Sequence, residues 1–431
     1  MAYLCISVLL LVGILYGLQS HKFSNLLSVF CFYWVAIIFL ASLELFEMIE
    51  VSSRTYFIIF IGGLGYIIGY FLSQNFRGVS IAIHNKRLTK IDFPKYEIRY
   101  KLAYIAMFIV CVFYLYSLIK IVLLLREGTD YGTIRTMMLH GGEDGIERLY
   151  TNLESLFSQY IVVPSVFICV PLSLISVVRG EAKKSFIALT FFDLILYVIC
   201  TGSRIILASL IVQIVYLKII YRVTVPKRVT KWLKKIILIG VIAIIIITFM
   251  RRSEYWEKIN YTIFQSYYSY ACLCVPLLDT WLDIIDTNNY ITYGLASLKP
   301  LLSIPDVIFR QFGISNLDSY YYTVDILNST EDYFWVFDNK NYNAFVTLFF
   351  YFYLDFREIG VFLGSLFYGR FCGKHYRKVT RDNNMKNVLL FLLLLQGFTK
   401  MLVRWEFSIN NYLIAFIVCR FFLKARVSDN D

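Results

Sequence analysis

The chain has 431 residues, of which 58% are hydrophobic and only 17% are charged. This composition excludes an ordinary soluble globular protein and indicates a protein that crosses a membrane several times. The formal net charge of +12 would favour nucleic acid as the partner of a soluble protein, but here the basic residues gather in a few loops. The positive-inside rule explains that distribution, so we expect no nucleic-acid partner.

Apolar runs of span length begin at the N-terminus. Ala2–Leu18 lacks a charged start and a small-residue cleavage site, so we interpret it as the first span and not as a signal peptide. The predicted spans are Ala2–Leu18, Leu26–Leu43, Tyr56–Leu72, Leu102–Leu125, Tyr160–Val178, Ser185–Cys200, Ile205–Tyr221, Ile236–Phe249, Ala344–Phe371, Val388–Leu402 and Phe407–Phe422. We therefore predict an all-α, polytopic membrane helix bundle of about 11 transmembrane helices (about 10–12), forming a single domain over residues 1–431.

The distribution of lysine and arginine predicts the orientation of the bundle. Gln74–Lys101, Arg179–Lys184 and Arg222–Lys235 are basic connections and should be cytoplasmic. The connections between them, including Arg126–Gln159 and the very short Thr201–Arg204, should then lie outside.

Met250–Asn343 is the largest stretch of mixed polarity, and this orientation makes it one large extracytoplasmic loop. It is rich in aromatic residues, which stack well on sugar rings but also cover the end of any membrane bundle. A long loop held at one face of a helical bundle is a natural place for a substrate site.

The last third of the chain returns to the cytoplasm at the basic stretch Cys372–Lys386. Ala344–Phe371, the segment before it, is interrupted by the polar run Asp355–Gly360. Either one broken or tilted span, or a re-entrant segment followed by a short span, satisfies the charge pattern.

Arginines at the outer ends of the predicted spans are the main functional candidates. They are Arg135, Arg204, Arg251, Arg252 and Arg404. Guanidinium groups are planar forks that bind phosphate oxygens bidentately and stay charged in a partly dry site, so this set suits a lipid diphosphate. Each of them also fits the simpler role of an interfacial anchor, and that alternative stays open.

A general base is needed if a sugar hydroxyl is to be activated. His140, Glu143 and Asp144 in one outer connection are the catalytic candidates, and the residues alone do not decide among them and other outer acids such as Glu406. Asp355, Arg357 and Glu358 can form an internal ion pair at a helix break. Neither the cysteines nor the histidines show metal-ligand spacing, so we expect no metal and no cofactor.

Short motifs give the chain a family resemblance. They are Asp130-Tyr131-Gly132-Thr133-Ile134-Arg135, Thr201-Gly202-Ser203-Arg204, a span ending in Arg251-Arg252, and Tyr353-Leu354-Asp355-Phe356-Arg357-Glu358-Ile359-Gly360. With its large outer loop, the chain resembles the Wzy-type O-antigen and capsule polymerases, also called oligosaccharide repeat unit polymerases. Family members often have a glycine where this chain has Arg357 or Glu358, so the role of Asp355 is open.

The resemblance implies a glycosyltransferase of the bacterial cytoplasmic (inner) membrane. Such an enzyme joins undecaprenyl-diphosphate-linked oligosaccharides into O-antigen, capsule or exopolysaccharide by a metal-independent, inverting transfer. Its expected partners are these lipid-linked glycans, the lipid bilayer, a chain-length regulator and a flippase.

Other functions stay open. A flippase of lipid-linked oligosaccharides would also need charges in its bundle, although transporters usually show internal repeats and a midplane site. An O-antigen ligase would share the outer arginines and differ in its acceptor. Polyprenyl-phosphate-sugar transferases typically carry acids after their first span, where this chain has Gln19-Ser20-His21-Lys22. A scaffold without activity is the remaining alternative.

Overall fold

The computed structural model describes residues 1–74, 96–140, 147–203, 205–221, 238, 259–311, 317–338 and 340–425. The described chain is mostly helical, with small two-stranded sheets as its only sheets. Five helices in the described residues are long and apolar enough to cross a membrane, or up to six if one bent pair is a single span. The structure thus agrees with an all-α membrane protein, whereas the count of about 11 spans stays a prediction.

The chain divides into two compact units, each built from segments that are far apart in sequence. The first unit contains 1–89, 258–381 and 400–409, and the second contains 90–257, 382–399 and 410–431. Each unit is described by itself below.

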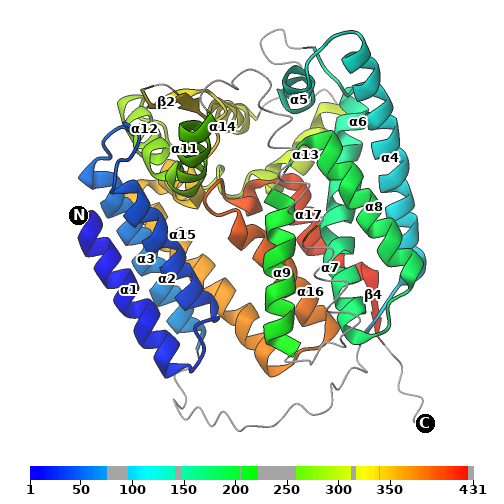
Figure 1. Ribbon diagram of the computed structural model, residues 1–431, viewed down its shortest axis with the longest axis horizontal. Helices are drawn as coiled ribbons and strands as arrows, with labels where there is room; N and C mark the ends of the chain where they lie inside the picture. The colour runs from blue at the N-terminus through cyan, green and yellow to red at the C-terminus, as the bar shows by residue number, and fades with distance from the viewer. Residues whose placement is uncertain are drawn as a thin grey trace. The chain divides into compact units, whose positions relative to one another are not determined.

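The first unit holds the N-terminal helices and most of the segment predicted as a large loop. Its elements are α1 (Ala2–Gln19), α2 (Leu26–Ala41), α3 (Ser53–Ser73), α11 (Ile259–Cys272), α12 (Cys274–Thr287), α13 (Lys299–Gln311), α14 (Asp318–Ser329), β2 (Phe334–Phe337), β3 (Lys340–Tyr342), α15 (Thr347–Arg381) and the short 3-10 helix η2 (Glu406–Ser408). The side chains of Asn25 and Ser52 accept hydrogen bonds from the first turns of α2 and α3, which fixes where these helices begin. The helices α1, α2, α3 and α15 lie side by side (Figure 1).

Glycines bring α3 and α15 into very close contact. A Cβ on Gly65 or Gly69 of α3 would collide with the carbonyl oxygen of Phe362 or Leu366, and a Cβ on Gly369 would collide with that of Tyr66. Small residues four apart let helix backbones approach in this way, which is the usual packing device between helices in a membrane. Because Gly65 meets Phe362 and Ser73 meets Gly373, this part of α15 runs parallel to α3.

The helix α15 reverses direction at Phe356 and Arg357, whose backbone angles are not helical. Before the break, Phe349 lies against Gly62 in the middle of α3, and Tyr353 reaches Arg54 at the start of α3. The first arm therefore runs antiparallel to α3. The backbone of Gly360 lies so close to the carbonyl oxygen of Phe352 that a Cβ on Gly360 would collide with it. Because these residues are eight positions apart, this contact requires a sharp turn between the two arms. Of the two arrangements that the sequence left open, the structure has a helical hairpin and not one tilted span.

The segment Met250–Asn343 is largely helical where it is described, since α11–α14 and the β2–β3 hairpin lie in it. Phe264–Cys272 and Cys274–Thr287 form the bent pair, at 51°, that passes the test for a membrane span when taken together. The polar face of these helices hid them in the sequence, because the mixed polarity of the segment resembled that of a loop.

The second unit holds the remaining elements. They are β1 (Tyr96–Ile98), α4 (Tyr100–Arg126), α5 (Tyr131–His140), α6 (Asn152–Phe157), the π-helix η1 (Ser158–Val162), α7 (Val163–Arg179), α8 (Lys184–Thr201), α9 (Ile205–Tyr221), α16 (Met385–Thr399), α17 (Asn410–Val418), the 3-10 helix η3 (Cys419–Phe422) and β4 (Leu423–Ala425). The helices α4, α7 and α8 pack against one another (Figure 1). The strands β1 and β4 pair antiparallel, with Tyr96 opposite Ala425.

Candidate functional site

The turn from Lys400 to Ser408 brings three charged side chains together, and two of them, Lys400 and Glu406, are buried. Its backbone is held by the segment that leads into α15, since the N–H groups of Val346 and Leu348 donate to the carbonyl oxygens of Val403 (3.2 Å) and Met401 (2.9 Å). These bonds keep the turn from relaxing as an isolated loop would, so its side chains are held in place.

Glu406 is the centre of this turn. Its side chain is 1% exposed, and its carboxylate accepts from Lys400 Nζ at 3.0 Å and from Arg404 Nε at 3.0 Å. Burial alone would raise the pKa of Glu406, but the charges of Lys400 and Arg404 outweigh it and hold that pKa below its usual range. The carboxylate is thus ionised, and it fixes both cations.

The cations outnumber the acids around this turn. Lys299 begins α13, which lies against η2, and no carboxylate among the described residues pairs with it. Burial first, and the charge of Arg404 second, lower the pKa of Lys299 to about 8. Only Nε of Arg404 has a partner in the described part of the chain, and this side chain is 39% exposed. Glu331 adds a second negative charge near Arg404, which leaves Lys299, Lys400 and Arg404 facing two acids.

An anion bound between two half-buried cations would relieve the repulsion between them, which makes such a pair a candidate anion site. The free terminal nitrogens of Arg404 form the planar fork that binds a phosphate bidentately. Lys299 adds a point charge from a different segment of the chain. We call Lys299, Lys400, Arg404 and Glu406 the basic turn site.

The loop Thr292–Ser297 places Lys299 beside Arg404. Asp355, at the end of the first arm of α15, accepts from Thr292 Oγ1 (2.6 Å) and from the backbone N–H groups of Gly294, Ala296 and Ser297 (each 3.0 Å). The indole of Trp405 donates to the carbonyl oxygen of Ser297 at 3.1 Å. Asp355 therefore has a structural task, and it does not form the ion pair with Arg357 that the sequence allowed.

A second charged cluster lies around Asp286 of α12. Its carboxylate pairs with Arg54 and, at 3.3 Å, with Arg357, and it accepts from the hydroxyl of Tyr353 at 2.9 Å. Arg54 also pairs with Asp283 at 3.4 Å. Here the acids balance the arginines, so the cluster joins α3, α12 and the break in α15 and leaves no excess charge for a ligand.

The predicted site residues are not all within the described part of the chain. Arg404 belongs to the basic turn site. Arg135 lies on α5 of the second unit, partly buried. His140 ends α5, but its side chain lies outside the described part. The remaining candidates, Glu143, Asp144, Arg204, Arg251 and Arg252, lie outside the described residues.

Comparisons of the chain with models of protein families, with curated proteins and with solved structures find no match. Within the described ranges, no group of three or more His, Cys, Asp or Glu side chains could hold a metal ion. The expectation of a metal-independent reaction stays a prediction.

Lys299 and Lys400 are not among the site residues predicted from the sequence. Lys400 left a signal, because it interrupts an apolar run one turn before Arg404. Lys299 has no such signal in the sequence, because only the fold brings it to the turn. A third missed residue is Asp193 of α8, which is fully buried and interacts with the thiol of Cys111.

Proposed function

We propose that this protein is a polymerase that joins undecaprenyl-diphosphate-linked oligosaccharide repeat units at the outer face of a bacterial cytoplasmic membrane. The observation that carries the proposal is the excess of positive charge at the basic turn site, where Lys299 and Arg404 lack sufficient acid to balance them. The resemblance of short sequence motifs to those of Wzy-type polymerases supplies the substrate class.

In this reaction a sugar hydroxyl of the acceptor attacks the anomeric carbon of the donor glycan. The new glycosidic C–O bond forms as the bond from that carbon to the diphosphate breaks, and the electron pair leaves with the diphosphate. A base takes the hydroxyl proton; His140, Glu143 and Asp144 remain the candidates for it. Fixed cations help most where charge develops, so Arg404 and Lys299 act on the departing diphosphate.

The first test is a gel of surface glycan from cells that lack this protein. The proposal expects single repeat units without a ladder of longer chains. Lipid-linked units trapped inside the cell would instead indicate a flippase, and polymer that is made but not transferred to its final acceptor would indicate a ligase.

The second test returns variants of the basic turn site to those cells. Arg404→Lys keeps a positive charge beside Glu406 but loses the planar fork, so we expect roughly tenfold or greater loss of polymer at normal protein level. Arg370→Ala, an exposed arginine on α15, is the matched control and should leave the ladder intact. An intact ladder in both variants would overturn the role of Arg404.

A further inference from the structure

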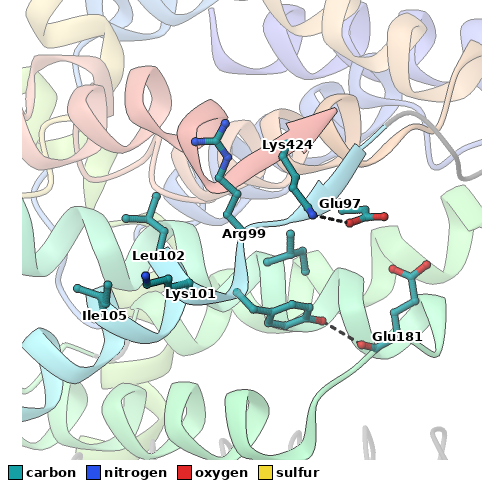
Figure 2. Close-up of a pocket in the computed structure, with 9 residues that line it drawn as sticks. Glu97, Arg99, Lys101, Leu102, Ile105, Glu181 and Lys424 are labelled. Carbon is teal, nitrogen blue, oxygen red and sulfur yellow. Dashed lines mark hydrogen bonds and ion pairs between the residues drawn. The ribbon is translucent and has the colours of Figure 1, made fainter. Parts of the chain in front are cut away.

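A pocket of about 980 Å³ lies in the second unit at the start of α4. The β1–β4 ladder borders it, and the N–H of Arg99 donates to the carbonyl oxygen of Phe422 at 2.8 Å, so the two ends of this unit meet at the pocket. Figure 2 shows Arg99 and Lys101 leaving the same stretch of chain, with Lys424 and Glu97 on one side and Glu181 on another.

The charges that line the pocket do not balance. Glu97 is paired with Lys424 at 3.1 Å (Figure 2), and Glu181 is paired with Arg179 at 3.1 Å. Both acids of the lining are thus already neutralised. Arg99 and Lys101 are exposed, and no acid among the described residues pairs with either of them. The pocket therefore presents a net positive charge to an anionic group.

An apolar surface continues from the pocket along α4. Ile105 lines the pocket and is 49% exposed, and Phe108, Val112 and Ile119 follow on the same face with 66%, 52% and 61% of their surface exposed. The helix has 27 residues and is one of the candidate membrane spans, so this face suits contact with acyl chains.

We propose that this pocket binds the headgroup of an anionic phospholipid, with the phosphate between Arg99 and Lys101 and an acyl chain along α4 from Ile105. A basic pocket at the end of a membrane helix is a known form of lipid headgroup site. The continuity of cations with an apolar face selects a lipid over a free anion, because a free anion would gain nothing from Ile105 and Phe108. This site is distinct from the basic turn site and does not depend on the proposed polymerase activity.

The test uses the full-length protein in detergent and native mass spectrometry with phosphatidylglycerol and phosphatidylcholine of identical acyl chains. Wild-type protein should retain phosphatidylglycerol preferentially. In the double variant Arg99→Gln, Lys101→Gln, the ratio of retained phosphatidylglycerol to phosphatidylcholine should be roughly tenfold lower. Arg126→Gln, at the other end of the same helix, is the matched control and should keep it. No preference in the wild type, or an equal preference in the double variant, overturns the proposal.

A variant that is expected to bind more lipid tests whether the double variant loses binding only because it is misfolded. Glu97→Gln frees Lys424, so it should strengthen retention of phosphatidylglycerol, which partial unfolding would not do. Inorganic phosphate is the competing probe. If millimolar phosphate displaces the lipid from wild type and Ile105→Ser leaves retention unchanged, the site takes a free phosphate and the lipid assignment is wrong.

Discussion

Lys299 and Arg404 lie close enough that the charge of Arg404 adds to burial in lowering the pKa of Lys299. A bound anion would relieve this repulsion, and such perturbed groups are typical of functional sites. The basic turn site has this property, whereas the cluster around Asp286 does not, because its arginines are paired with acids. The excess of cations makes the basic turn site a candidate ligand site, whereas the balanced cluster around Asp286 has a structural role.

The pH dependence of glycan transfer should report on Lys299. Its pKa of about 8 means that the ammonium is charged below that pH and neutral above it. If the charged form binds the diphosphate, the rate falls as pH rises through about 8, and Lys299→Arg abolishes that fall because guanidinium stays charged. The measurement is the initial rate with purified protein and lipid-linked repeat units. A rate that rises through the same pH would instead make Lys299 a general base.

Two buried aspartates should respond differently to the same substitution. Asp355 accepts four hydrogen bonds, so Asp355→Asn should lower the free energy of unfolding by roughly 2 kcal/mol. Among the described residues the Asp193 carboxyl group interacts with the thiol of Cys111, which is only a weak hydrogen-bond donor, so its replacement loses little stabilisation. Asp193→Asn, isosteric and neutral, should change stability by less than about 1 kcal/mol. Denaturant unfolding in detergent compares them, and equal losses would contradict this contrast.

At the scale of elements, the contact between α3 and α15 depends on the absence of side chains. A Cβ at Gly69 would meet the backbone of Leu366 and Arg370, which cannot move aside, whereas a Cβ at Gly63 would meet only the flexible end of Leu9 at 3.1 Å. We expect Gly69→Ala to cost about 1–3 kcal/mol of stability, and Gly63→Ala to cost less. Thermal unfolding of the purified variants measures this, and a Gly63 variant as unstable as the Gly69 variant would disprove it.

The break in α15 places a residue with a side chain where glycine is favoured. Arg357 has φ 54° and ψ −144°, which is strained for any residue except glycine. Arg357→Gly and Arg357→Ala both lose the ion pair with Asp286, but only the glycine relieves the strain. The glycine variant should therefore be more stable than the alanine variant by about 1 kcal/mol in a chemical denaturation experiment. The reverse order would mean that the backbone at this position is not strained.

At the scale of the whole molecule, hydropathy located several helices well. The predicted Tyr56–Leu72 and Ser185–Cys200 agree closely with α3 and α8, because a continuous apolar run is a local signal. The polar run at Asp355 correctly marked a break in the span, but the reversal of direction there depends on packing against α3. Arg404 became a candidate because its charge lies at the outer end of a predicted span, whereas Lys299 reaches it only through the fold. Such long-range contacts have no local pattern.

Because α3 and the second arm of α15 run parallel, their first residues should lie on the same side of the membrane. Ser53→Cys and Glu358→Cys should react with a membrane-impermeant maleimide from the same side, which the charge pattern predicts to be outside. Lys374→Cys, at the far end of that arm, should react only after the membrane is opened. Labelling of Ser53 and Glu358 from opposite sides would rule out this arrangement.

The pairing of α3 with α15 also has a consequence for how the protein is made. The two helices are joined through a glycine seam, yet Ser73 ends one and Thr347 begins the other, so most of the polypeptide is translated between them. During synthesis, α3 is therefore inserted before α15 exists, and its glycine face has no packing partner until α15 has been translated. A ribosome that stalls before that point leaves an orphaned helix with a groove of bare backbone, which is the kind of surface that membrane quality-control proteases and holding chaperones meet first.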